Sequence, residues 1–229
     1  MDREVVTASG TRVAFAEDGI ESGRPMVLLH GLGESRADWD GVLGRLGQSH
    51  RTIAFDLRGH GRSDWPDSYS VALMSHDVEH ALDALPVSDA VVVGHSLGGM
   101  VAFDLTARRP DLVHALVVED VAPPQAQPPR PEPVRPDVEL PFDWDVVVAI
   151  RAETDAGDAG LWAALENIHV PTLIIAGGPD STMDQGRLLD AARRLPHGTL
   201  KTLEAGHHIQ RARPDAYCDL LLDWLDVTD

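Results

Sequence analysis

The chain has 229 residues, of which 43% are hydrophobic and 24% charged, and these ordinary proportions exclude a disordered or fibrous protein. Asp and Glu number 37 against 19 Lys and Arg, giving a formal net charge of -18, and no basic run is long enough to neutralise the phosphates of a nucleic acid. We therefore expect one folded unit without a nucleic-acid partner.

The sequence offers no sign of secretion or membrane insertion. Cys218 is the single cysteine, so no internal disulfide forms. The opening residues MDREVVTASG are charged rather than apolar, and no apolar run approaches the length of a membrane span. We expect a cytoplasmic protein with no membrane partner, and the pattern leaves its oligomeric state open.

The strands expected first along the chain are two edge strands in EVVTASGTRVAFAEDG, joined at Ser9–Gly10 as an antiparallel hairpin. Six short apolar runs follow, each continuous at its centre, as in strands buried on both faces of a parallel sheet. The runs are MVLLH (26–30), TIAFD (52–56), AVVVG (90–94), ALVVED (115–120), TLIIAG (172–177) and LKTLEAG (200–206).

Stretches with apolar residues at helical spacing separate these runs, and several end at Gly or Pro. Alternating strands and helices predict an α/β fold with a mostly parallel central sheet of about eight strands and helices on both faces.

A proline-rich insertion interrupts this alternation. Residues 121–141 carry proline after proline, which excludes a central strand or a helix interior. We interpret 121–168 as a short cap inserted in a core formed by 1–120 and 169–229. Residues 122–136 are expected to form a mobile strap, and Phe142, Trp144 and Trp162 are expected either to line an apolar pocket or simply to pack.

Residues 94–99, GHSLGG, match G-x-S-x-G where a buried strand ends and a helical pattern begins. A sharp turn there forces unfavourable backbone angles on Ser96 and brings chain segments so close that side chains at Gly94 and Gly98 would clash. The sequence predicts that Ser96 is a nucleophile at the edge of the sheet, and the alternative is a tight turn capped by a serine.

A nucleophilic serine needs a base and an orienting acid, which follow it along the chain in this type of fold. His207 follows the last predicted strand and is the expected base, because Gly206 frees the backbone to turn; His208 is the alternative.

The acid has two candidate positions. Asp180 lies just beyond one strand and is the favoured acid, although it is also placed to cap the next helix. Glu119 and Asp120 end the preceding strand and preserve the same order of serine, acid and histidine. The choice rests on order alone, so Asp120 and Glu119 stay open.

Backbone N–H groups are needed to hold the negative charge that develops on a substrate carbonyl oxygen. Leu97, directly after the serine, is one expected donor. Leu32, in HGLGES (30–35) after another strand, is the other.

Five motifs occur together in one order: HGLGES, DLRGHGRSD (56–64), GHSLGGM (94–100), PTLIIAGGPD (171–180) and AGHHIQRARP (205–214). In this series the chain resembles the α/β-hydrolase fold superfamily, in particular its small bacterial esterase, lactonase and cofactor-free haloperoxidase-like members. The resemblance implies Ser96 as nucleophile, Asp180 as acid, His207 as base, and Leu32 and Leu97 as oxyanion donors.

The expected activity is hydrolysis of a carboxylic ester of a small or medium soluble substrate through an acyl-enzyme, with no metal and no organic cofactor. Lactone, thioester or C–C bond hydrolysis and cofactor-free perhydrolysis use the same triad and stay open. The alternative outside enzymes is a non-catalytic sensor of a small molecule.

Overall fold

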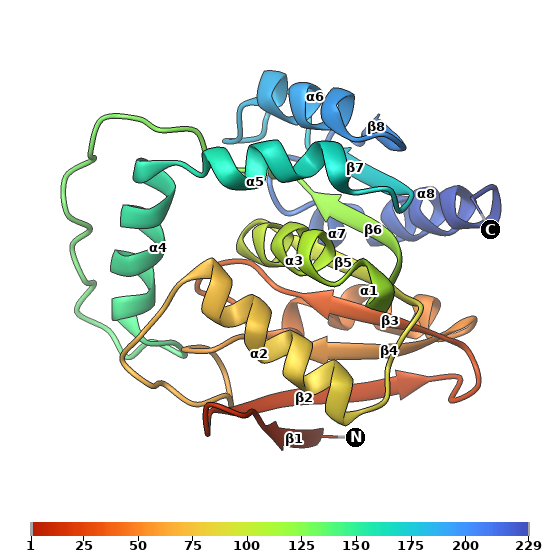
Figure 1. Ribbon diagram of the computed structural model, residues 1–229, viewed down its shortest axis with the longest axis horizontal. Helices are drawn as coiled ribbons and strands as arrows, with labels where there is room; N and C mark the ends of the chain where they lie inside the picture. Colours follow the sequence, from red (N-terminus) through yellow and green to blue (C-terminus); the bar gives the residue numbers. More distant parts are fainter. Residues whose placement is uncertain (1, 229) are drawn as a thin grey trace.

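The computed structural model describes residues 2–228 and contains one eight-stranded sheet in the order β1-β2-β4-β3-β5-β6-β7-β8 (Figure 1). The pairs β1–β2 and β2–β4 are antiparallel and every other neighbouring pair is parallel. The strands are β1 (Asp2–Val6), β2 (Arg12–Gly19), β3 (Arg24–Leu29), β4 (His50–Phe55), β5 (Ala90–His95), β6 (Val113–Glu119), β7 (Thr172–Ala176) and β8 (Gly198–Thr202).

Helices cover both faces of this sheet, as predicted for an α/β fold (Figure 1). Side chains of β3 show how one strand supplies two cores: Val27 and Leu29 join one apolar cluster, while Met26 and Leu28 join the other. The first cluster packs against α2 (Val71–Ala84), α3 (Leu97–Arg108) and α6 (Gln185–Arg194), and the second against α1 (Asp40–Leu46), α7 (Ile209–Ala212) and α8 (Pro214–Asp226).

Three short 3-10 helices within residues 2–228 complete the connections of the sheet. They are η1 (Arg36–Trp39), η2 (Pro110–Leu112) and η3 (Leu165–Asn167).

The long connection between β6 and β7 holds the proline-rich segment. Residues 121–143 form no helix and no strand beyond an isolated bridge between Phe142 and His60. The chain then enters α4 (Trp144–Ala156) and α5 (Ala159–Ala164). Figure 1 shows the proline-rich segment passing along the outside of α4, which stands to one side of the sheet. The boundaries of a cap unit at 121 and 168 stay a prediction.

The first part of this segment is tied to the helices beside it. The Asp155 carboxylate accepts hydrogen bonds from the backbone N of Arg130 (3.0 Å), from Arg130 Nε (2.6 Å) and from Gln127 Nε2 (3.1 Å). The carbonyl of Pro124 accepts from Trp162 Nε1 (3.2 Å). Residues 131–140, in contrast, make no hydrogen bond to any part of the described chain.

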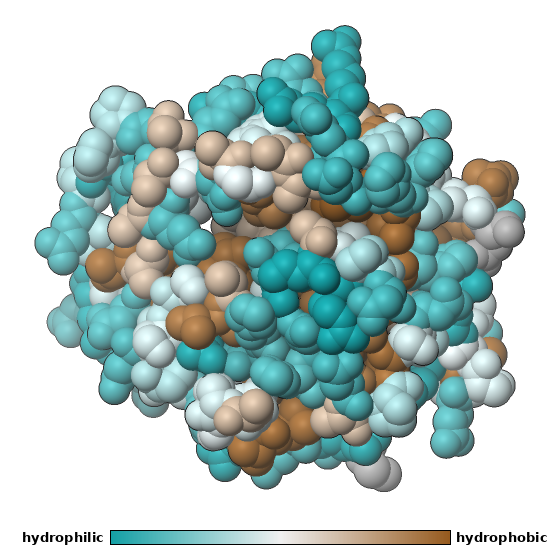
Figure 2. All heavy atoms as spheres, in the orientation of Figure 1, coloured by the Kyte–Doolittle hydropathy of each residue, from teal (hydrophilic) through white to brown (hydrophobic). Residues whose placement is uncertain are grey.

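The surface seen in Figure 2 is mostly hydrophilic, and hydrophobic side chains gather beside a hollow between the α4 region and the rest of the molecule. Of the helices in residues 2–228, none has both the length and the apolar character that crossing a bilayer requires.

Candidate active site

The serine turn has the geometry that its glycines predict. Ser96 lies between β5 and α3 with φ 51° and ψ −114°, a left-handed conformation that is strained for any residue with a side chain. A Cβ atom on Gly94 would lie 2.3 Å from the carbonyl oxygen of Gly98, and one on Gly98 would lie 2.1 Å from that of Leu29. The turn therefore requires glycine at both positions and presents the serine hydroxyl at the carboxyl end of the sheet.

His207 lies between the serine and a carboxylate. Its Nε2 atom is 3.1 Å from Oγ of Ser96, and its Nδ1 atom is 2.8 Å from Oδ2 of Asp120. Gly206, with φ 73°, makes the turn that brings the imidazole over the sheet. These distances allow a proton to pass from the hydroxyl to the imidazole while the carboxylate holds the opposite ring nitrogen.

The prediction that Asp180 is the acid is wrong, because the structure places Asp120 on His207. Asp120 directly follows β6, which pairs with the strand that ends at the serine turn, so its carboxylate reaches the same edge. Asp180 lies four residues beyond Ala176, the last residue of β7, and is exposed. It does not cap α6 either, since Asp184 takes that position.

The Asp120 carboxylate is held in its ionised form by its donors. Burial acts to raise its pKa, but hydrogen bonds from His207, Ser181, the backbone N of Gly177 and the side chain of Gln185 outweigh burial and lower the pKa. Asp120 is thus a negative charge aimed at the imidazole at neutral pH.

Glu119 and His208, the other candidates, have different positions. Glu119 is fully buried, and its Oε1 atom accepts hydrogen bonds from the backbone N of Ile209 (2.8 Å) and of Gln210 (3.2 Å). Burial raises the pKa of this carboxyl to about 7. His208 points to Glu34 instead of the serine, with 2.8 Å between Nε2 and Oε1. Both side chains hold the loop around His207 and neither forms a hydrogen bond with Ser96 Oγ, although the backbone oxygen of Glu119 accepts one from the backbone N of Ser96 (3.1 Å).

A network that the sequence analysis did not find lies behind His207. Glu34 Oε2 is 3.2 Å from His95 Nδ1, and His95 Nε2 is 2.9 Å from the backbone oxygen of His207. Burial acts to raise the pKa of Glu34, but His95, Arg211 and His208 outweigh it and lower this pKa to about 2. The ionised Glu34 therefore holds His95, and His95 in turn holds the backbone of His207, the candidate base.

Glu34, Asp38 and His95 bring their ligand atoms within 4.8 Å of one another, a spacing that suits a metal ion. The guanidinium of Arg211 already pairs with both carboxylates, and lies 3.5 Å from Glu34 Oε1. The cluster thus has a cation of its own, and the absence of a metal from the reaction stays a prediction.

The expected oxyanion donors, Leu32 and Leu97, line the same cavity as Ser96. Neither backbone amide donates a hydrogen bond to any residue in the range 2–228. The neighbouring amide of Gly33, in contrast, is taken by His60 Nε2 at 3.0 Å. Both amides are therefore available for an oxygen of a bound molecule.

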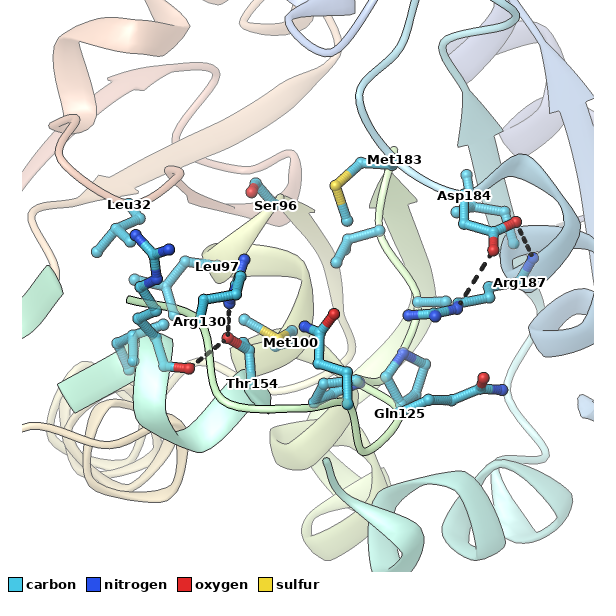
Figure 3. Close-up of a pocket in the computed structure, with 18 of the residues that line it drawn as sticks. Leu32, Ser96, Leu97, Met100, Gln125, Arg130, Thr154, Met183, Asp184 and Arg187 are labelled. Atoms are coloured by element: carbon cyan, nitrogen blue, oxygen red, sulfur yellow. Dashed lines mark hydrogen bonds and ion pairs between the residues drawn. The ribbon is translucent and has the colours of Figure 1, made fainter. Parts of the chain in front are cut away.

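The cavity beside Ser96 has a volume of about 390 Å³ and lies between the serine turn, the segment after β6, α4 and the loop before α6 (Figure 3). Phe142, Trp144 and Trp162 do not line it, and Trp162, which lies on α5, is buried in the core. Its apolar lining residues are Leu32, Leu97, Met100, Val121, Ala122, Val147, Ile150, Met183 and Leu188.

Comparisons with known proteins identify the family to which this fold belongs. The family model described as alpha/beta hydrolase fold matches residues 24–160, and the chain therefore belongs to the α/β-hydrolase fold family.

Among curated relatives, a protein of uncharacterised function from Mycobacterium bovis is 41% identical over 113 residues, which are 49% of this chain and 33% of that protein. The chain thus spans about a third of the length of the first curated relatives that it matches. An esterase of Mycobacterium tuberculosis is 27% identical over 248 residues, covering 88% of this chain and 83% of its own. Among solved structures, a hydrolase from Pseudomonas aeruginosa has a TM-score of 0.85 at 26% identity, over 98% of both chains.

Proposed function

We propose that this protein is a serine hydrolase that cleaves a carboxylic ester of a small or medium soluble substrate through an acyl-enzyme. The observation that carries the proposal is the chain of contacts from Ser96 Oγ to His207 Nε2 (3.1 Å) and from His207 Nδ1 to Asp120 (2.8 Å), beside a mostly apolar cavity. The resemblance to an esterase over most of the chain supports an ester as the substrate.

In the first half-reaction, Ser96 Oγ attacks the ester carbonyl carbon and its proton passes to His207 Nε2. The carbonyl oxygen takes the negative charge and accepts hydrogen bonds from the amides of Leu32 and Leu97. The bond from the carbonyl carbon to the alcohol oxygen then breaks, and His207 gives its proton to that oxygen. The alcohol leaves, and the acyl group stays on the serine.

In the second half-reaction, water attacks the acyl-serine while His207 takes one of its protons. The bond between the acyl carbon and Oγ breaks, and His207 returns a proton to Oγ. The product acid keeps the other proton of the water, releases it to solvent, and leaves as a carboxylate. Asp120 keeps its charge throughout and stabilises the imidazolium that forms in both halves.

The test is labelling and turnover in the same preparation. A fluorophosphonate probe should add one equivalent to the wild type, on Ser96, and none to Ser96→Ala, as read by intact mass and peptide mapping. Wild type should hydrolyse p-nitrophenyl esters, and Ser96→Ala should lose about 10³-fold or more of kcat.

Equal labelling in Ser96→Ala, or labelling without turnover of any ester, lactone or thioester, would overturn the proposal. The second result would favour a sensor. Lactone and thioester substrates belong in the same assay, because they react through the same acyl-enzyme.

A further inference from the structure

Three arginines line the cavity that contains Ser96: Arg130, Arg151 and Arg187. Three cations around one cavity are unexpected in a protein whose formal net charge is -18. Two of the three already have a partner carboxylate. Arg130 Nε lies 2.6 Å from Asp155. Arg187 Nε lies 3.4 Å from Asp184 (Figure 3).

Arg151 has no such partner. Its side chain forms no ion pair and no hydrogen bond with any residue in the range 2–228, and its Nε atom is buried without an acceptor. Burial of an unpaired guanidinium N–H is unfavourable, whereas an anion beside it restores a charge-assisted hydrogen bond. The charge of Arg151 helps to lower the pKa of Asp155, but that carboxylate already pairs with Arg130 and forms no hydrogen bond or ion pair with Arg151. The cavity therefore holds one guanidinium to which no carboxylate in the range 2–228 is hydrogen-bonded.

The position of Arg151 on α4 sets it apart from the apolar part of the cavity. Val147, Ile150, Arg151 and Thr154 all line the cavity and share one face of the helix, at helical spacing. The first two are apolar and the last two polar. In Figure 3 the labelled Ser96 lies across the cavity from Thr154, so an acyl chain that starts at the serine has room to end in a polar group near this part of α4.

His207, which delivers the proton to the leaving alcohol, does not line this cavity. The alcohol thus departs on the side of His207, and the cavity receives the acyl part of the substrate. We propose that the substrate is an ester whose acyl chain carries a carboxylate remote from the scissile bond, and that Arg151 binds this carboxylate. The proposal rests on the proposed function as a serine hydrolase and specifies its substrate class.

The experiment compares matched substrates. The mono-p-nitrophenyl esters of succinate, glutarate and adipate carry the distal carboxylate, and the p-nitrophenyl esters of the monocarboxylic acids of equal chain length do not. The wild type should show a kcat/KM about tenfold or more higher for a half-ester than for its neutral match at one or more of these lengths.

Arg151→Met keeps most of the stem and removes the charge. It should lose about 10- to 100-fold of kcat/KM on the preferred half-ester and change by less than about threefold on the neutral ester. Arg151→Lys should retain part of the preference. Arg193→Met, an exposed arginine on α6 outside the cavity, is the matched control and should change neither substrate.

A wild type that prefers the neutral ester at every length would overturn the proposal without any variant, and so would equal losses on both substrates in Arg151→Met at an unchanged melting temperature. If Arg151→Met does not fold, the proposal is tested by the preference of the wild type for half-esters and by how much of this preference Arg151→Lys retains. A failure of the proposed function looks different, because neither substrate would then be hydrolysed and fluorophosphonate would not label Ser96.

Discussion

Replacing Asp120 by Asn removes the charge beside His207 with almost no change in shape. The side-chain oxygen of Asn can still accept from the amide of Gly177, which is 2.8 Å from Asp120 Oδ1. The new NH₂ group, however, cannot accept the Nδ1–H of His207, so the imidazole is driven to the wrong tautomer. We expect kcat to fall about 10³- to 10⁴-fold. At about 1.36 kcal/mol for each factor of ten, this is about 4 to 5.5 kcal/mol of lost transition-state stabilisation.

Stability should respond as well, with a pH dependence whose sign follows from the lowered pKa of Asp120. A carboxyl with a folded-state pKa below its unfolded value of 3.8 stabilises the protein above that value and loses this contribution as pH falls through the folded pKa. Asp120→Asn should therefore melt below the wild type at pH 7, and the gap should narrow as pH is lowered below about 4.

The assay is kcat and KM on p-nitrophenyl acetate, together with thermal melting followed by circular dichroism. Asp180→Asn is the matched control, since Asp180 is exposed and contacts no catalytic group, and it should stay within about twofold of wild type. A loss of more than about 100-fold in Asp180→Asn, or a loss of less than about tenfold in Asp120→Asn, would refute the reasoning.

Three further predictions concern other parts of the site. Gly98→Ala should lose at least about 3 kcal/mol of unfolding free energy in urea, because its Cβ would lie 2.1 Å from the Leu29 carbonyl oxygen; a loss below about 1 kcal/mol would contradict the packing. Glu119 has a folded pKa of about 7 against 4.5, so its protonation stabilises the protein at low pH and this contribution fades as pH rises from about 4.5 to about 7. The melting temperature of Glu119→Gln should thus rise relative to that of the wild type between about pH 4.5 and about pH 7. A difference that stays constant over this range would show that the protonation of Glu119 does not contribute to stability. Asp155→Ala should speed hydrogen exchange across 124–130 and raise KM several-fold with kcat within about twofold, whereas unchanged exchange would mean that Asp155 does not hold the segment.

The sheet was predictable because its signals are local. Apolar runs without alternation mark strands buried on both faces, and the pairing of β3 with β4 and β5 places these runs at the centre. The hairpin at the edge follows from Gly10, which takes φ 84°. The tight turn at Ser96 was predictable for the same reason, since the glycines around it report a close approach of the backbone.

The carboxylate that contacts His207 was not predictable from order alone. Asp120 and Asp180 both follow a strand and precede His207, so the sequence permits either. Their difference is spatial: Asp120 leaves β6 with φ 49° and turns to the histidine at once, while Asp180 lies further along a loop that carries it to solvent. A stronger weight on the residue immediately after a strand would have favoured Asp120.

The network of Glu34, His95 and His208 joins three distant segments and has no local pattern. Glu34 lies in HGLGES, and His95 is the variable position of G-x-S-x-G, so each was inside a recognised motif without an assigned role. Only the fold brings Glu34 Oε2 to 3.2 Å from His95 Nδ1.

The loop between β7 and α6 both contacts Asp120 and lines the cavity, and this combination matters for protein engineering. Ser181 and Gln185 donate hydrogen bonds to Asp120, and between them in sequence Met183 and Asp184 line the cavity. A library that randomises this loop to change substrate preference will also disturb the hydrogen bonds to Asp120. Variants with a new preference should therefore have a lower kcat. The wall formed by α4 (Trp144–Ala156) supplies none of the side-chain hydrogen bonds that hold Asp120 in residues 2–228, and diversification there, for example at Val147, should alter which acyl groups fit while leaving the rate of the chemical step intact.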